Sequence, residues 1–198
     1  MPIKKGVDAV LEVLSHKLGF DPKDENFKDT PERVEKLYKE MFLPPEIIQL
    51  EIEKIFEKVF PTTYSGIILI PEMVTYSMCP HHLLPVEYHV TVAYLPNQIS
   101  HSERQVLGLS KPIRIVEVLS KLPILQEDYT QKIADTFMRI AKGVAVVTVG
   151  IHGCMRCRGV RTRSPAVMSV MTGPFMTEPK VREEFYFLLN YSRNFVGR

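Results

Sequence analysis

Two short segments of this sequence combine cysteine with histidine. The first reads Cys79-Pro80-His81-His82, a C-x-x-H spacing, and the second reads His152-Gly153-Cys154-Met155-Arg156-Cys157. Thiolates and imidazoles are the ligands that zinc prefers in proteins. The two segments together therefore predict one zinc site, assembled from distant parts of the chain.

Two coordination schemes are compatible with these spacings. In the first, both members of the C-x-x-H pair and both members of the C-x-x-C pair hold a structural zinc ion, and the chain is a zinc-stabilised binding module. In the second, three ligands leave a fourth position open for water, as in catalytic zinc sites. The catalytic ligand set is Cys79, His82 and Cys154.

The strand pattern before Cys154 favours the catalytic scheme. Residues 144–151 are predicted to form a strand, and if that strand continues, Cys154 and Cys157 face opposite sides of it. Cys157 is then a small buried hydrophobic residue and not a ligand. His81 and His152 remain beside the metal as candidate acids or bases.

A candidate anion site begins at Ser110, just before a predicted helix. Lys111 and Arg114 lie in the first turn of that helix, where the helix dipole already presents positive charge, so a bound anion is expected to compensate them. A solvated helix start is the alternative. Further positive charge comes from Arg33, Lys36, Arg156, Arg158, Arg161 and Arg163, and so much positive charge beside a metal predicts a polyphosphate substrate.

Gln126 and Glu127 open the next predicted helix. Glu127 has two interpretations: an acid favoured by the dipole in a first turn, or a carboxylate that accepts hydrogen bonds from the N–H groups of a purine.

The elements that must position these residues change in type along the chain. Apolar spacing predicts a helical N-terminal region over residues 1–60, and β-rich runs then predict strands with two helices between them. The predicted strands cover 66–70, 74–77, 88–94, 144–151 and 166–171, the two helices carry apolar stripes at 115–122 and 133–141, and a last helix covers about 179–191. This order favours an α+β fold with an antiparallel sheet and helices on one face, with the catalytic region over 61–198.

Composition restricts the class of protein. The chain has 198 residues, 45% of them hydrophobic and 24% charged, which suits one compact globular domain. Its 25 Lys and Arg against 23 Asp and Glu leave a net charge of +2, so neither nucleic acid nor a membrane surface is an expected partner. Asp8 and Glu12 interrupt any N-terminal signal region, and we expect a cytoplasmic protein.

These motifs resemble the GTP cyclohydrolase I family, over nearly the whole chain from about residue 29 to residue 189. The matching segments are Thr30-Pro31-Glu32-Arg33-Val34 with Lys36, Ser77-Met78-Cys79-Pro80-His81-His82-Leu83, Val106-Leu107-Gly108-Leu109-Ser110-Lys111, Gln126-Glu127 with Thr130, His152-Gly153-Cys154 with Arg158-Gly159, and Arg182-Glu183-Glu184-Phe185. The resemblance implies the tunnelling fold (T-fold) and a homo-oligomeric ring, usually a decamer of two stacked pentamers, with active sites between subunits.

The resemblance also implies a reaction. The family hydrolyses GTP at carbon 8 of guanine, releases formate and forms 7,8-dihydroneopterin triphosphate, from which folate and other pterins are made. Zn²⁺ would be held by Cys79, His82 and Cys154. His152 would protonate nitrogen 7 of guanine while zinc-bound water attacks carbon 8.

The remaining roles follow from the same resemblance. His81 and Ser110 would assist the later opening and rearrangement of the ribose. Gln126 and Glu127 would hold the guanine edge. The triphosphate would be bound by Arg33, Lys36, Lys111, Arg114 and Arg158.

Two departures from the family pattern stand out. Pro80 takes the place of the family's usual Glu, and residues 97–105 form a longer connection than usual. Because Pro80 removes a carboxylate and a backbone N–H donor beside the metal, a relative that stops at the ring-opened pyrimidine is an alternative. A nitrile reductase of the same fold is disfavoured, since the chain has no dinucleotide-binding fingerprint.

Overall fold

The N-terminal unit is a pair of helices. In the computed structural model, which describes residues 3–100 and 103–196, the chain divides into two units, 1–43 and 44–198. Helix α1 (Ile3–Leu18) ends at Gly19, whose φ of 75° is one that glycine adopts without strain, and α2 (Thr30–Met41) packs against α1. Pro31 is the one buried side chain among the described residues of this unit. The two helices therefore have little core of their own.

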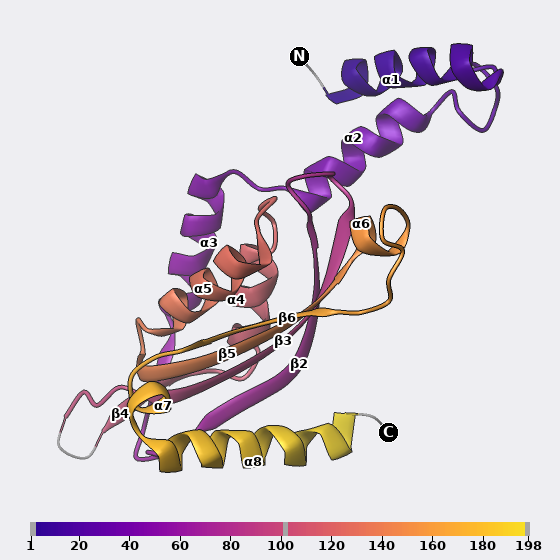
Figure 1. The fold of residues 1–198 in the computed structure, drawn as a ribbon. Helices are drawn as coiled ribbons and strands as arrows, with labels where there is room; N and C mark the ends of the chain where they lie inside the picture. Colours follow the sequence, from indigo (N-terminus) through magenta and orange to yellow (C-terminus); the bar gives the residue numbers. More distant parts are fainter. Residues whose placement is uncertain (1–2, 101–102, 197–198) are drawn as a thin grey trace. The chain divides into compact units, whose positions relative to one another are not determined.

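A four-stranded antiparallel sheet lies at the centre of the second unit (Figure 1). Its strands are β2 (Ile68–Met78), β3 (Pro85–Pro96), β5 (Ala141–His152) and β6 (Ala166–Met171), in the order β2-β3-β5-β6. The two central strands are almost continuously buried, as expected of strands covered on both faces. The predicted strands at 88–94, 144–151 and 166–171 are confirmed.

Two details of the sheet differ from the sequence pattern. The predicted strands at 66–70 and 74–77 belong to one strand, β2, whose register against β3 shifts between Ile70 and Met73. Glu72 lies in this irregularity with a φ of 51°. A separate two-stranded sheet pairs β1 (Val59–Thr62) with β4 (Arg104–Leu107). Strand β4 begins at the end of the connection over residues 97–105 that the sequence marked as long, and residues 101–102 of that connection lie outside the described residues.

Helices cover both faces of the sheet (Figure 1). Helices α4 (Lys111–Leu119) and α5 (Gln126–Phe137) pack on one face, where Tyr129 stacks on Tyr88 at 4.9 Å between ring centroids. Helix α8 (Pro179–Val196) and the short α7 (Pro174–Thr177) lie on the other face. There Phe185 and Leu189 of α8 form a buried cluster with Ala93 and other residues.

The prediction of helices on one face is therefore wrong. The α+β class and the antiparallel pairing are confirmed, but small residues such as Ala93 and Ala145 leave room on the second face, and the apolar stripe of α8 fills it. An amphipathic helix pattern predicts that a helix needs an apolar partner, but not which face of the sheet supplies it.

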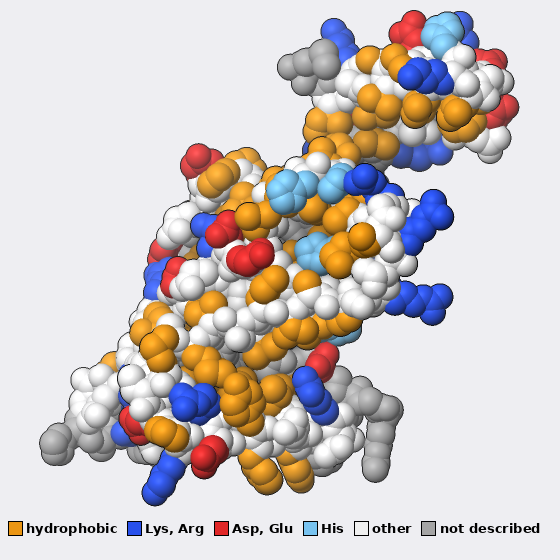
Figure 2. Space-filling view, viewed as in Figure 1, with side chains coloured by type: hydrophobic (Ala, Val, Ile, Leu, Met, Phe, Trp, Pro, Cys, Tyr) orange, Lys and Arg blue, Asp and Glu red, His pale blue; other side chains and the backbone are white. Residues whose placement is uncertain are grey.

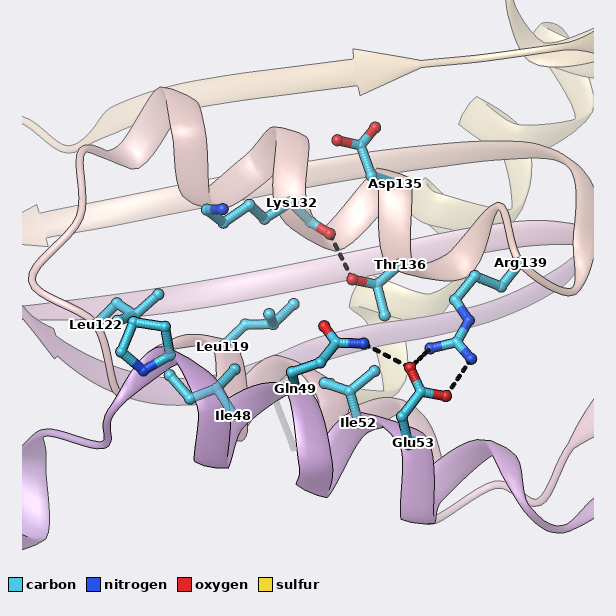
Figure 3. Close-up of a pocket in the computed structure, with 11 residues that line it drawn as sticks. Ile48, Gln49, Ile52, Glu53, Leu119, Leu122, Lys132, Asp135, Thr136 and Arg139 are labelled. Carbon is cyan, nitrogen blue, oxygen red and sulfur yellow. Dashed lines mark hydrogen bonds and ion pairs between the residues drawn. The ribbon is translucent and has the colours of Figure 1, made fainter.

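Helix α3 (Pro45–Phe56) belongs to the second unit, although its helical pattern continues that of the N-terminal region. It buries Ile48, Ile52 and Ile55 and packs against α4. A cavity of about 560 Å³ lies between α3, α4 and α5 (Figure 3). At its rim Arg139 donates to both carboxylate oxygens of Glu53, at 3.1 and 2.6 Å.

Among the described residues, no helix combines the length and the apolar character needed to cross a bilayer.

Candidate metal and catalytic site

The site is built where three strand ends meet. Strand β2 ends at Met78, and the turn that follows, residues 79–84, is closed by the N–H of Cys79 donating to Leu84 at 2.9 Å. Strand β3 then returns beside β5, so that His152 at the end of β5 pairs with Val86 at the start of β3. Antiparallel pairing thus brings the segment around Cys79 to the segment around Cys154. Figure 2 shows histidine side chains gathered at one end of this unit, with Lys and Arg at its edge.

Cys79, His82 and Cys154 form a group that could hold a metal ion. Their ligand atoms all lie within 4.8 Å of one another, and Cys79 is buried while His82 is exposed. Burial raises the pKa of the Cys154 thiol, and the neighbouring Cys79 thiol raises it further. A divalent cation held by Cys79 and Cys154 would remove this electrostatic penalty, because its charge would stabilise both residues as thiolates. The predicted three ligands are therefore together in the structure.

The reasoning that excluded Cys157 was wrong in one respect. The strand does not continue past His152; a single helical turn, α6 (Gly153–Arg156), follows at once, and the N–H of Cys157 donates to Gly153 at 3.0 Å. Cys157 is exposed and not buried. It still stays out of the ligand group, because the helical turn directs Cys154, and not Cys157, toward Cys79.

A cavity of about 250 Å³ adjoins the three ligands. Its walls come from the turn after β2, the start of α5, the end of β5 and the start of β6. The lining residues are Cys79, Pro80, His81, His82, Ile124, Leu125, Gln126, Glu127, His152, Cys154, Ala166 and Met168. Seven residues to which the sequence assigned metal, catalytic or guanine-binding roles thus surround one cavity.

Gln126 holds His152 in place at the wall of this cavity. The buried amide nitrogen of Gln126 donates to the carbonyl oxygens of Thr148 and Ala166, each at 3.1 Å, which fixes the amide oxygen as the acceptor for Nε2–H of His152 at 2.8 Å. Burial lowers the pKa of His152, and Glu127 opposes that shift. The ring is therefore neutral near pH 7, with its proton on Nε2.

Two further predicted residues flank the ligands. Nδ1 of His81 lies 3.9 Å from the sulfur of Cys79. Arg158 donates to Nε2 of His82 at 2.5 Å, although Arg158 does not line the cavity. A guanidinium and a second imidazole are thus next to the metal group.

Three residues of the predicted anion site, all in the same unit as this cavity, do not line it. Ser110, Lys111 and Arg114 lie at the start of α4, whereas the end of α4 is the part near the site, since Ser77 donates to the carbonyl of Leu122 at 2.9 Å. Ser110 makes no capping hydrogen bond with its side chain. Arg33 and Lys36 belong to α2 of the N-terminal unit and not to the unit that holds this cavity.

Comparison with known proteins identifies the family. A family model described as GTP cyclohydrolase I matches residues 4–190. The chain belongs to the GTP cyclohydrolase I family. It is 42% identical to "GTP cyclohydrolase 1" of Caldanaerobacter subterraneus subsp. tengcongensis, over 96% of this chain and 97% of the relative, and 40% identical to that of Thermoanaerobacter pseudethanolicus, over 95% of each. The protein of the same name from Clostridium perfringens strain 13 is 36% identical over 95% of this chain and 96% of the relative.

One solved structure, of an archaeosine synthase QueF-Like in the apo form, was also found to be similar to this chain. The match covers 56% of this chain and 96% of the other, at 14% identity and a TM-score of 0.43.

One polar side chain beside the site, that of Tyr88, was not predicted from the sequence. Tyr88 is fully buried on β3, edge-on to His152 at 6.1 Å between ring centroids, and its hydroxyl has no hydrogen-bond partner among the described residues. Burial raises the pKa of the Tyr88 hydroxyl far above its ordinary value, and the charges of Cys79, Glu127 and Cys154 raise it further. Nothing in the strand pattern distinguishes Tyr88 from a core aromatic.

The larger cavity, between α3, α4 and α5, has a different lining from the cavity at the candidate metal ligands. Its floor is apolar, with Ile48, Ile52 and Leu119, and its rim carries the Arg139–Glu53 ion pair (Figure 3). None of the residues with predicted catalytic, binding or metal roles lines it. The three candidate metal ligands and the two candidate acid–base histidines line the smaller cavity instead.

Proposed function

We propose that this protein is a zinc-dependent GTP cyclohydrolase I of the cytoplasm, which hydrolyses GTP at carbon 8 of guanine, releases formate and rearranges the product to 7,8-dihydroneopterin triphosphate. The observation that carries this proposal is the group of Cys79, His82 and Cys154 beside His152 at one cavity. Relatives named GTP cyclohydrolase 1 at 35–42% identity over nearly the full chain support it.

The donor set fits zinc. Two thiolates and one imidazole are typical zinc ligands, and three protein ligands are the number found in catalytic zinc sites. A zinc ion bound there lowers the pKa of water and supplies a hydroxide-like nucleophile near neutral pH. Cys157 contributes nothing to this set, which argues against the four-ligand structural scheme.

His152 acts as the proton donor to nitrogen 7 of guanine in this proposal. Its Nε2 carries a hydrogen that Gln126 orients, so a purine nitrogen in the cavity can take the place of the Gln126 oxygen as acceptor. Because the ring is neutral near pH 7, it must first take up a proton, and the lowered pKa makes the protonated ring a stronger acid than free histidine. Gln126 and Glu127, at the first turn of α5, hold the guanine edge, and His81 assists the later ribose steps with Ser110.

The triphosphate extends toward positive charge. Arg158, which donates to His82, supplies positive charge at this chain's own ligands, and more comes from Lys111, Arg114, Arg33 and Lys36. Because Ser110, Lys111 and Arg114 do not line the cavity of their own chain, we propose that a neighbouring copy supplies them. A homo-oligomeric ring with sites between subunits, such as a decamer, meets this requirement.

Replacement of Cys154 tests the metal and the reaction together. Cys154→Ser should lose stoichiometric zinc and lower turnover by at least about a hundredfold, because a hydroxyl is a far weaker zinc ligand than a thiolate. Zinc content is measured by elemental analysis, and formate and oxidised, fluorescent pterin are measured in one GTP reaction. Cys157→Ser is the matched control and should keep both. Normal turnover in Cys154→Ser would exclude the proposed site.

The product distinguishes the proposal from its nearest alternative. Pro80 lines the cavity and contributes no carboxylate there, which favours a second candidate, an enzyme that stops at the ring-opened pyrimidine. Formate with pterin supports the full reaction. Formate without pterin supports the alternative.

A further inference from the structure

Cys154 and Cys157 are three residues apart in a single helical turn. The hydrogen bond from the N–H of Cys157 to Gly153 defines one helical turn over these residues. Residues three apart in such a turn have Cα atoms roughly 5 Å apart. Disulfides need a Cα separation of about 4.4–6.8 Å. The backbone can therefore accept a bond between these sulfurs with little movement.

The two cysteines differ in what holds them. Cys154 belongs to the metal group, whereas Cys157 is exposed and lies outside it. The function proposed above gives Cys157 no task. Cys79 is buried, so the thiol most open to a dissolved oxidant is Cys157. An exposed thiol one turn from a zinc thiolate is arranged as a redox partner.

We propose that Cys154 and Cys157 form a reversible disulfide that removes Cys154 from the zinc site and so switches the enzyme off under oxidising conditions. This inference rests on the zinc site of the proposed function. The oxidant is a hydroperoxide: the Cys157 thiolate attacks one peroxide oxygen, becomes a sulfenic acid and releases water or an alcohol. The Cys154 sulfur then attacks the Cys157 sulfur and displaces hydroxide, which takes a proton to form water.

The balance of this reaction is two thiols and one peroxide giving one disulfide and, for hydrogen peroxide, two waters. The disulfide sulfur is no longer a thiolate, so zinc keeps only Cys79 and His82 and dissociates. A dithiol reductant reverses the bond. Capture as a disulfide also protects Cys154 from irreversible oxidation to a sulfonic acid.

Zinc release tests the proposal without reference to turnover. The zinc-loaded full-length protein is freed of reductant and treated with hydrogen peroxide, while a chromophoric chelator reports zinc. We expect release from the unaltered protein and several-fold slower release from Cys157→Ser and Cys157→Ala. Dithiothreitol with added zinc should restore full zinc content to the unaltered protein. Equal release rates in all three proteins would overturn the proposal.

Peptide mapping identifies the bond itself. After alkylation of free thiols, trypsin cleaves at Arg156, between the two cysteines, so the proposed disulfide joins the peptide that ends at Arg156 to the dipeptide Cys157-Arg158. Finding that linked pair supports the proposal. Finding Cys79 linked to Cys154, or only unlinked sulfinic or sulfonic acids, overturns it. Zinc release and mapping remain informative even if GTP is not the substrate.

Discussion

Tyr88 and Tyr129 stack on each other, but their hydroxyl groups differ in hydrogen bonding. The Tyr129 hydroxyl donates to the carbonyl of Val116 at 2.8 Å, whereas the Tyr88 hydroxyl is buried without a partner among the described residues. Tyr88→Phe should raise the free energy of unfolding by up to about 1 kcal/mol, and Tyr129→Phe should lower it by about 1 kcal/mol. Urea unfolding measures both. A loss of stability in Tyr88→Phe would mean that its hydroxyl is satisfied after all.

His89 lies between two carboxylates on the sheet face opposite α4 and α5. Its Nδ1 is 3.2 Å from Glu72 and its Nε2 is 2.9 Å from Glu87. Burial alone lowers the pKa of His89, but the hydrogen bonds to Glu87 and Glu72 outweigh burial and raise the pKa overall. Protonated His89 therefore stabilises the fold.

The sign of the pH dependence follows. This stabilisation is complete below the unfolded-state pKa near 6.5 and is lost as pH rises through the higher folded-state pKa. Between about pH 6 and about pH 9, the unaltered protein should lose more unfolding free energy than His89→Gln does, because only the unaltered protein loses the stabilising charge of the imidazolium. Urea unfolding at fixed protein concentration measures this. His16→Gln, on exposed α1, is the control, and an equal effect there would refute the assignment.

Several site residues were predictable because their signals are local. The turn after β2 is enough to bring the Cys and His of the C-x-x-H pair near each other. The start of α5 at Gln126 follows from Pro123 before it and from the apolar stripe after it. The bond between Gln126 and His152 was not predictable, since it joins residues 26 positions apart through the packing of α5 on β5. Cys154 lies in one group with Cys79 and His82, but the argument from strand alternation that selected it was wrong, because the strand ends where α6 begins.

At the scale of elements, α3 illustrates how a helix joins a unit. It presents Ile48, Ile52 and Ile55 inward and Ile47 outward, the latter 41% exposed. Ile52→Ala should lower the free energy of unfolding by about 2–4 kcal/mol because it leaves a void beside an existing cavity, and Ile47→Ala should cost less than about 1 kcal/mol. Thermal or urea unfolding compares them. Similar losses in both variants would place α3 differently.

The elements that sequence reasoning missed share a physical cause. Strands β1 and β4 have four residues each, too few for a periodic pattern, and each exists because the other pairs with it across more than 40 positions. The position of α8 on the second face depends likewise on Ala93 and Ala145, which lie far from it in the sequence. Local patterns predicted the helices and the long strands but not these pairings.

At the scale of the whole molecule, the residues predicted for one site lie in two separate places on the same chain. Cys154 lies at the cavity, but Lys111 does not. If neighbouring copies complete each site, Cys154→Ser and Lys111→Ala should each be nearly inactive alone, yet regain activity when co-assembled. Random mixing in equal amounts should restore up to about one quarter of the sites, because one site in four receives both intact parts.

Complementation is measured as pterin formation after the two variants are dissociated, mixed and reassembled. The variants mixed without dissociation are the control and should stay inactive. If reassembled mixtures stay as inactive as the separate variants, then Lys111 and Cys154 serve the same site from one chain, or Lys111 has no part in it.

The two cysteines of the metal group are 75 positions apart, and the segment between them contains β3, β4, α4, α5 and β5. A bound ion therefore closes a loop that includes most of the core, and it acts on the unfolded chain as a cross-link does, by reducing the number of conformations open to it. Ion binding and folding would then be linked in one equilibrium, in which the free concentration of the ion contributes to the fraction of folded chain. If the proposed ion is zinc, this protein would be less stable as well as inactive in a cell short of zinc.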